Sequence, residues 1–255
     1  MPADPTRRHV LGAGLASLGL AGLPRLARGL GSTSLVDVAE IQLPSGTTSR
    51  PQAWHRLLFE VMQSTSVECE PRTVQVAPED PELFAHPFSV LLGTGELPEL
   101  SEAAVAQLVR YLSYGGFLLI DDTTSSPGGP FELSVRRLCA RMFPTRMLSP
   151  LQKNHSLYRS FFLLDRPVGR TDVTGVLEGI TMDKVTPLVS CGMDLSGALA
   201  RGPDGRDLYP VVPGGNRQRR EALKLGINMV LYSLTSNYKH DQAHVLELIR
   251  EGRIE

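Results

Sequence analysis

The chain of 255 residues has little of what marks nucleic-acid-binding, disulfide-rich or membrane-spanning proteins. Its formal net charge is −1, so it offers no excess of basic residues to a polyanion, and nucleic acid is not an expected partner. It has only three cysteines, Cys69, Cys139 and Cys191, and no two have metal-ligand spacing. Free buried thiols are therefore expected, without a disulfide framework or a cysteine-based zinc site. The apolar stretch 10–23 has 14 residues, short of the roughly 20 that a transmembrane helix needs.

The N-terminal segment is typical of an export signal. It reads TRRHVLGAGLASLGLAGLPRLARG, in which Arg7 and Arg8 follow Thr6, the uncharged stretch 10–23 comes next, and a proline and an arginine close it. The paired arginines resemble a twin-arginine signal. An amphipathic N-terminal helix is the alternative, but the stretch has no polar face beyond Ser17. We therefore expect residues 1–31 to direct the protein to the periplasm or another exported location.

The cleavage point of this segment is less well defined. Residues 27–29 read Ala-Arg-Gly, a tolerable small-x-small triplet whose arginine and final glycine are not ideal. If the segment stayed uncleaved, it would anchor the protein. No cysteine lies near the apolar stretch, so a lipoprotein is not expected.

Beyond residue 31, short apolar runs alternate with amphipathic stretches, which is the pattern of a parallel α/β sheet. The clearest unit is FSVLLGTGELPELSEAAVAQLVRYLSYGGFLLIDD. Residues 88–92 predict a strand covered on both faces, Ser101 can cap a helix, and residues 117–120 predict the next strand. We see no repeat or linker and expect one domain over residues 32–255.

The remaining elements are fainter but fit the same architecture. Strands are predicted at 35–43, 73–76 and 186–191, and helices at 51–62, 131–142 and 216 to about 236, with a hairpin or irregular insertion at 151–184. Five strands with right-handed crossovers predict a three-layer, doubly wound, mostly parallel sheet in the flavodoxin-like order 2-1-3-4-5.

Ligands of such sheets bind outside the carboxyl ends of the strands. Four short segments at predicted strand ends are therefore candidate ligand-binding positions. They are residues 44–46, 93–96, 121–122 and 191–194. Gly93, Thr94 and Gly95 are the candidate ligand-binding residues, although their segment lacks the third glycine of a phosphate-binding fingerprint and carries glutamates instead. A tight turn is the plainer interpretation of these glycines.

Five stretches together resemble the DUF4159 family of bacterial proteins. They are PFSVLLGTG at 87–95, YLSYGGFLLIDD at 111–122, HSLY at 155–158, VSCGMDL at 189–195 and KLGINMVLYSLTSNYK at 224–239. The resemblance implies a fold related to class I glutamine amidotransferase-like proteins, without an established activity. It also implies, as partners, envelope or membrane proteins of the von Willebrand A type that work with MoxR-type ATPases.

Amidotransferase chemistry needs a cysteine on a sharp strand-to-helix turn, activated by a histidine that an acid orients. Cys191 ends a predicted strand and Gly192 follows it. However, no glycine stands two residues before this cysteine, and no His-x-Glu follows downstream. A small buried residue is the favoured interpretation of Cys191.

Asp121, Asp122, His155 and Asp194 are the weak candidates for catalysis. One aspartate at the strand end, with His155 and Asp194, could hold a divalent metal or act as acid and base on a polyol or sugar. Neighbouring residues of a strand point to opposite faces, so only one of Asp121 and Asp122 can face such a site. Alternatively, an aspartate accepts backbone amides of the following loop, and His155 packs beneath Tyr158.

The C-terminal segment HDQAH places His240 and His244 four residues apart, as in zinc proteases. Aspartate is one carbon shorter than the usual glutamate base, and no third ligand is apparent in residues 245–255. We therefore expect no metal and no cofactor, and we expect this segment to begin a last amphipathic helix after a break at 236–237.

These observations favour a non-catalytic binding or envelope-assembly module that is exported by a bacterium. The alternative is a hydrolase or metal-dependent enzyme acting on a carbohydrate-like substrate through the acidic residues and His155. A grouping of those side chains around one cleft would favour the enzyme, and a buried, hydrogen-bonded His155 would disfavour it.

Overall fold

The computed structural model describes residues 35–250, with the side chains of residue 51 and of residues 236–250 left out. The expected signal, residues 1–31, lies outside the described residues. Within the described part of the chain, no helix is both long and apolar enough to cross a membrane.

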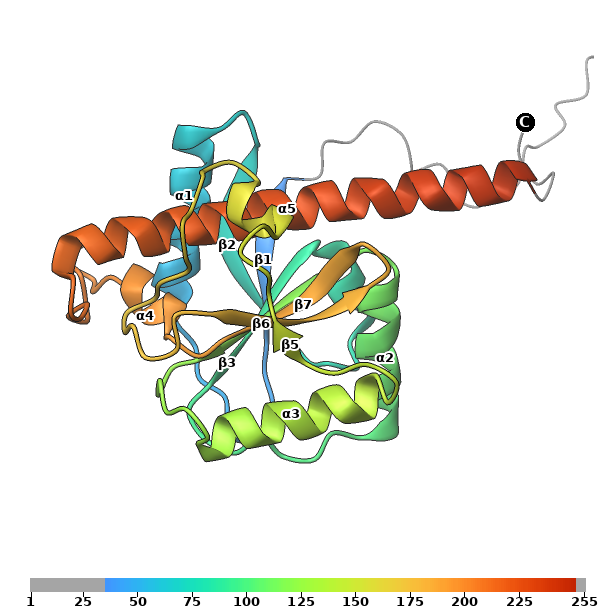
Figure 1. The fold of residues 1–255 in the computed structure, drawn as a ribbon, viewed down its shortest axis with the longest axis horizontal. Coiled ribbons are helices and arrows are strands. Elements are labelled where there is room, and N and C mark those ends of the chain that lie inside the picture. Colours follow the sequence, from blue (N-terminus) through green and yellow to red (C-terminus); the bar gives the residue numbers. More distant parts are fainter. Residues whose placement is uncertain (1–34, 251–255) are drawn as a thin grey trace, which may run out of the picture. The chain divides into compact units, whose positions relative to one another are not determined.

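The centre of the fold is a seven-stranded sheet of order β2-β1-β3-β4-β7-β6-β5 (Figure 1). The strands are β1 Val36–Ile41, β2 Cys69–Val76, β3 Phe88–Gly93, β4 Phe117–Asp122, β5 Ser149–Pro150, β6 Leu177–Met182 and β7 Val185–Cys191. The first five in this order, β2 to β7, are parallel, and β6 and β5 extend the sheet antiparallel. The doubly wound sheet is confirmed, with β7 as the predicted fifth strand.

Helices cover both faces of this sheet, which gives three layers (Figure 1). The helices are α1 Pro51–Ser64, α2 Glu102–Ser113, α3 Pro130–Met142, α4 Leu195–Leu199 and α5 Gly215–Arg250, with short 3-10 turns η1 Pro81–Ala85 and η2 Ser156–Arg159. Residues of α1, α4 and α5 share one hydrophobic cluster with the sheet, and residues of α2 and α3 share another. We call these the α1 face and the α3 face.

Local sequence explains why the helices form where they do. In α1, Trp54, Leu57, Leu58 and Val61 recur at helical spacing, and all four are fully buried. In α2, the Ser101 side chain accepts the amide N–H of Ala104 at 3.0 Å, as the predicted N-cap requires. Each buried large apolar side chain contributes about 1.5–3 kcal/mol, so these stripes dock the helices firmly.

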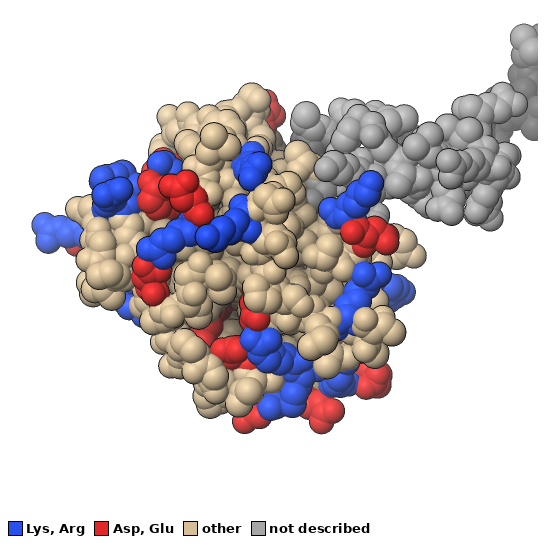
Figure 2. Space-filling view, viewed as in Figure 1, with Lys and Arg blue, Asp and Glu red and all other residues tan. Residues whose placement is uncertain are grey.

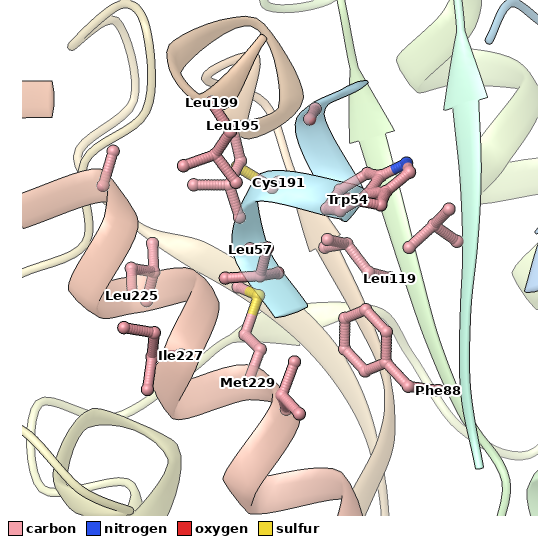
Figure 3. Packing of buried hydrophobic residues seen from close by; sticks show 14 of the residues in the cluster. Trp54, Leu57, Phe88, Leu119, Cys191, Leu195, Leu199, Leu225, Ile227 and Met229 are labelled. Atoms are coloured by element: carbon pink, nitrogen blue, oxygen red, sulfur yellow. The ribbon is translucent and has the colours of Figure 1, made fainter. Parts of the chain in front are cut away.

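On the α1 face, apolar side chains of the sheet, α1 and α5 pack against one another (Figure 3). Trp54 and Leu57 from α1 meet Leu119 from β4, while Leu225 and Met229 approach from α5. Cys191, at the end of β7, lies inside this cluster and is fully buried.

One prediction of secondary structure needs correction. Helix α5 runs unbroken through residues 236–237, where a break was predicted, because asparagine and serine inside a helix lower its stability without ending it. The insertion at 151–184 contains β6, which forms the predicted hairpin with β7 across Asp183, whose φ is +54°, and which also pairs with β5 just before the insertion. The sequence did not indicate the short helix α4, because five residues are too few to establish a helical period.

Candidate functional site

The carboxyl ends of β4 and β7 lie side by side, and Asp121 and Asp122 point to opposite faces of the sheet there. Asp121 continues the alternation of Phe117 and Leu119 and faces α4 on the α1 face. Asp122 lies on the same side of the strand as Leu118 and Ile120 and faces α3. The expectation from strand geometry therefore holds, and the two carboxylates have different surroundings.

Asp121 is fully buried, and both of its carboxylate oxygens bind the start of α4. Its Oδ1 accepts the N–H of Leu195 at 2.9 Å, and its Oδ2 accepts the N–H of Ser196 at 2.8 Å. The first N–H groups of a helix have no partner within the helix, so a carboxylate placed here stabilises α4. Asp121 thus ties β4 to α4 across 74 residues of sequence.

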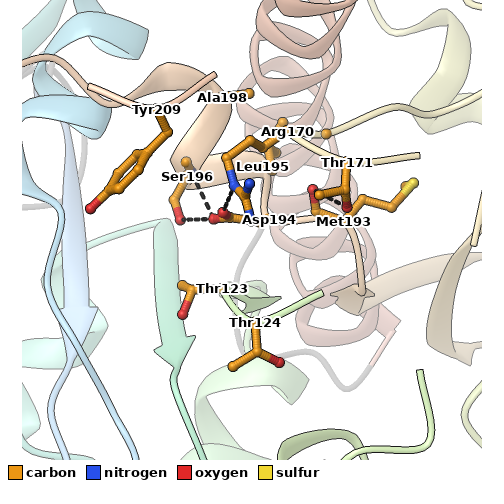
Figure 4. A network of polar contacts seen from close by, with 12 residues as sticks. Thr123, Thr124, Arg170, Thr171, Met193, Asp194, Leu195, Ser196, Ala198 and Tyr209 are labelled. Carbon is orange, nitrogen blue, oxygen red and sulfur yellow. Dashed lines mark hydrogen bonds and ion pairs between the residues drawn. The ribbon is translucent and has the colours of Figure 1, made fainter. Parts of the chain in front are cut away.

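Asp194 occupies the turn between β7 and α4 with a left-handed backbone, φ +52°. Its Oδ1 accepts the N–H of Gly197 at 2.9 Å, and a Cβ at that glycine would lie 2.2 Å from the Asp194 carboxylate. Its Oδ2 accepts a hydrogen bond from Nε of Arg170, and Nη2 of Arg50 lies 3.6 Å from Oδ1. Figure 4 shows Arg170 and Ser196 converging on Asp194. Asp194 therefore caps α4 and pairs with two partly buried guanidinium groups.

The proximity of the two buried carboxylates changes the protonation of Asp121. Burial, followed by the negative charge of Asp194, raises the pKa of Asp121 from 3.8 to about 6, against the backbone hydrogen bonds that favour its charged form. A raised pKa of this kind is found in catalytic acids and also in structural pairs. The hydrogen bonds decide in favour of structure here, because the oxygens of both aspartates are directed to α4 and to arginines.

Glu40 and Arg50 belong to the same buried edge, although the sequence reasoning missed them. Glu40 on β1 is fully buried, and it accepts hydrogen bonds from Nε2 of Gln42 at 2.8 Å and Nε1 of Trp54 at 3.3 Å. Arg50 stacks on the Tyr209 ring at 4.3 Å. A glutamate inside the predicted strand 35–43 was the available signal, since a buried charge needs partners from elsewhere in the fold.

His155 lies at the other end of the sheet. Its Nε2 is 2.9 Å from Oγ1 of Thr186, near the start of β7, whereas Asp121 pairs with Cys191 at the end of that strand. Its Nδ1 accepts the N–H of Leu157 at 3.2 Å, so the imidazole caps η2. Burial lowers the pKa of His155, which favours the neutral ring. The structure thus brings Asp121 and Asp194 together but leaves His155 apart from them.

Cys191 lies at the end of a strand, as a nucleophile of this architecture would, but its thiol is not reactive. Burial, followed by the neighbouring Asp121 charge, raises the pKa of its thiol well above the usual value. The thiolate is the reactive form of cysteine, so this thiol is inert at neutral pH. Cys69 and Cys139 are also free and buried.

Gly93 ends β3, and the chain bends at Thr94 and Gly95. The N–H of Thr94 donates to the carbonyl of Gly46 at 2.9 Å, and a Cβ at Gly93 would lie 1.6 Å from the Phe131 ring. Gly95 has open space around its Cα, with nothing within 4 Å of a Cβ placed there. Gly93 is thus required by the close approach of α3, while Gly95 is free of such a contact.

On the α3 face, a cavity of about 280 Å³ opens between the loop after β4, the first turns of α3 and the ends of β6 and β7. It is lined by Asp122, Pro127, Gly128, Phe131, Glu132, Arg136, Thr174, Val176, Glu178, Ser190 and Gly192. Figure 2 shows a hollow above α3 with acidic side chains at its wall. Asp122 and Gly192 belong to the strand ends that the sequence nominated, whereas Glu178 and Ser190 come from strands that only the fold brings beside them.

Within the described side chains, no three histidine, cysteine or acidic residues are grouped closely enough to hold a metal ion. The side chains of His240 and His244 lie outside the described residues, although the backbone there is part of α5.

The family model for a domain of unknown function, DUF4159, matches residues 37–234. The chain belongs to the DUF4159 family. The matched region begins in β1, contains both aspartates of β4 and the whole lining of the cavity, and ends within α5. No match is found among curated proteins. The resemblance drawn from the five sequence stretches is thereby confirmed at the level of the family, and the family description carries no activity.

Proposed function

We propose that this DUF4159 protein is a non-catalytic binding module of the bacterial envelope. The observation that carries the proposal is the bonding of Asp121 and Asp194. These two fully buried carboxylates stand where an enzyme of this architecture would keep reactive groups. Both are directed to the amides of α4 and to arginine side chains, so they serve the fold rather than a substrate.

The location and the partners rest on the sequence. Residues 1–31 have the layout of a twin-arginine signal, and that route exports proteins that are already folded. Three free buried thiols agree with folding in the reducing cytosol before export. The family resemblance suggests partners of the von Willebrand A type associated with MoxR-type ATPases, so the module would contribute to assembly in the envelope.

The alternative, a hydrolase or metal-dependent enzyme for a carbohydrate-like substrate, receives less support. It needs an acid, a base and His155 around one cleft, and His155 bonds instead to Thr186 at the opposite end of the sheet.

An activity screen with matched variants tests the non-catalytic proposal. The purified protein would be assayed for hydrolysis of nitrophenyl glycosides and for release of ammonia from glutamine, beside Asp121→Asn, Asp194→Asn and Cys191→Ser. We expect no turnover that depends on any of these side chains. A turnover that is lost in a folded Asp121→Asn protein would overturn the proposal.

Fractionation of cells tests the export proposal separately. The wild-type chain should appear in the periplasmic fraction, and replacement of Arg7 and Arg8 by lysine should retain it in the cytosol. Periplasmic recovery of the doubly substituted chain would contradict a twin-arginine route.

A further inference from the structure

The cavity on the α3 face has an excess of negative charge that the fold itself does not neutralise. Three carboxylates line it, from Asp122, Glu132 and Glu178, against one guanidinium, from Arg136. Arg136 donates to Glu132 at 2.8 Å and to Glu178 at 2.7 Å, so its charge is already shared between two partners. The remaining negative charge favours a cationic ligand.

Asp122 provides an independent indication of a ligand site. Its residue is only 5% exposed, yet it lines the cavity. Its Oδ1 accepts the N–H of Thr124 at 2.8 Å and the hydroxyl of Thr124 at 2.6 Å. Among the described side chains and amides, none donates to its other oxygen, which leaves a free acceptor on a residue that lines the cavity. A carboxylate oxygen that accepts no hydrogen bond from the protein and borders a cavity is available to a donor in that cavity.

The remaining walls limit which cation fits. Phe131, Pro127 and Val176 provide apolar surface beside the acids, and the hydroxyl of Ser190 provides one further polar contact. The acidic groups are too dispersed to form a metal-ion cluster among the described side chains. An organic cation with a short aliphatic chain fits both the apolar and the acidic side chains of the lining. Its methylenes contact the apolar side chains, and its ammonium donates to the carboxylates.

We infer that this cavity binds a primary ammonium group carried on a short aliphatic chain, with Asp122 as its main acceptor. The inference rests on the proposed binding function and gives it a ligand class. The same group occurs on free alkylamines and on the lysine side chain of a partner protein, and the ammonium is recognised in the same way in both.

A nuclear magnetic resonance titration of the full chain tests the inference. n-Butylamine is added, and the amide signals of residues 122–129 are followed, with 1-butanol and butyrate as ligands of the same length without the positive charge. We expect saturable shifts with butylamine, and binding at least about tenfold weaker for the two control ligands, because a charged hydrogen bond is lost. Equal binding of butanol or butyrate, or no saturable shift, would overturn the inference.

A second ligand distinguishes the two sources of the ammonium group. Nα-acetyl-lysine methylamide has no amine other than that of its side chain. If it binds as butylamine does, the cavity accepts a lysine of a partner protein. If only butylamine binds, the ligand is a free amine. Either result supports the ammonium site.

Two pairs of variants test the assignment to this cavity. Asp122→Asn keeps the acceptor for Thr124 but removes the charge, and it should weaken butylamine binding about tenfold, whereas Asp204→Asn on an exposed loop should not. Val176→Trp fills the mouth of the cavity from a position that is 44% exposed, and it should abolish binding even if Asp122→Asn does not fold. Val173→Trp, at a comparably exposed position outside the lining, should bind like the wild type.

Failure of this inference is distinguishable from failure of the proposed function. Turnover that depends on Asp121 would contradict the non-catalytic proposal and leave amine binding intact, because Asp121 faces the opposite side of the sheet. Unchanged butylamine binding in both Asp122→Asn and Val176→Trp would contradict the cavity site alone.

Discussion

The two faces of the sheet use neighbouring aspartates of one strand end in opposite ways. On the α1 face, Asp121 is fully buried and both of its oxygens accept amide N–H groups of α4. On the α3 face, Asp122 keeps one oxygen open to a cavity whose wall has excess negative charge. The difference teaches that position at the carboxyl edge of a doubly wound sheet does not by itself make a residue functional. The partners of its oxygens decide its role.

Of the substitutions on the α1 face, removal of the Asp194 side chain should cause the largest loss of stability. Asp194→Ala takes the cap from α4, leaves Arg170 and Arg50 without their shared carboxylate, and places alanine at φ +52°. Loss of one partner of a buried ion pair costs about 3–5 kcal/mol. Urea unfolding should show a loss of that order, against a change within about 0.5 kcal/mol for Asp204→Ala on the surface. A cost below about 1 kcal/mol would contradict the structural role of Asp194.

Protonation of Asp121 should make the α1 face more stable in mild acid. Its pKa is about 6 in the native state, and the ordinary value of 3.8 applies after unfolding. The native state therefore binds the proton more tightly, and the resulting stabilisation is fully present below about pH 4 and is lost as the pH rises through 6. The free energy of unfolding of the wild type relative to Asp121→Asn should rise by about 2 kcal/mol between pH 7.5 and 4.5. A difference that does not change with pH would contradict the raised pKa.

Gly93 tests how tightly the α3 face is packed. Gly93→Ala places a Cβ within 1.6 Å of the Phe131 ring, so the ring and the wall of the cavity must move. Overpacking of this kind costs about 1–3 kcal/mol. Gly95→Ala is the matched control, because nothing lies within 4 Å of its Cβ. Thermal unfolding should separate the two variants, and equal melting temperatures would mean that Phe131 does not pack against Gly93.

Substitution of His155 should have the smallest effect on stability and no effect on binding at the carboxyl ends of the strands. His155→Ala removes the bond to Thr186 and the cap of η2, at a cost of about 1 kcal/mol in the free energy of unfolding. Butylamine binding should stay unchanged, because the ring lies at the opposite end of the sheet. A tenfold loss of binding would contradict this placement, and the titration described above measures it.

The sequence predicted the sheet well because its strands carry their own signals. Residues 88–92 and 117–120 are continuous apolar runs, as required of strands covered on both faces, and Ser101 stands where an N-cap is needed. Helix α4 carried no such signal, because its five residues form a helix only when Asp121 and Asp194 supply the caps. One of these carboxylates lies about a quarter of the chain away in sequence.

The candidate site was predictable only in part. Alternation along a strand separates Asp121 from Asp122, and the strand-end rule nominates both. Neither rule shows that Arg170 reaches Asp194, or that Glu132, Glu178 and Ser190 line one cavity, because these contacts depend on how the insertion 151–184 adds β6 to the sheet. Pairs of charges distant in sequence leave no local pattern.

The different roles of Asp121 and Asp122 are tested most directly by the free energy of unfolding of Asp121→Asn and Asp122→Asn, measured with urea at pH 7.5. The two substitutions are chemically identical and adjacent in sequence. Asp121→Asn leaves an amide N–H of α4 facing another donor and should cost about 2–4 kcal/mol. Asp122→Asn keeps its bonds to Thr124 and should cost less than about 1 kcal/mol. Equal costs, or a larger cost at Asp122, would contradict the division of roles between the two faces.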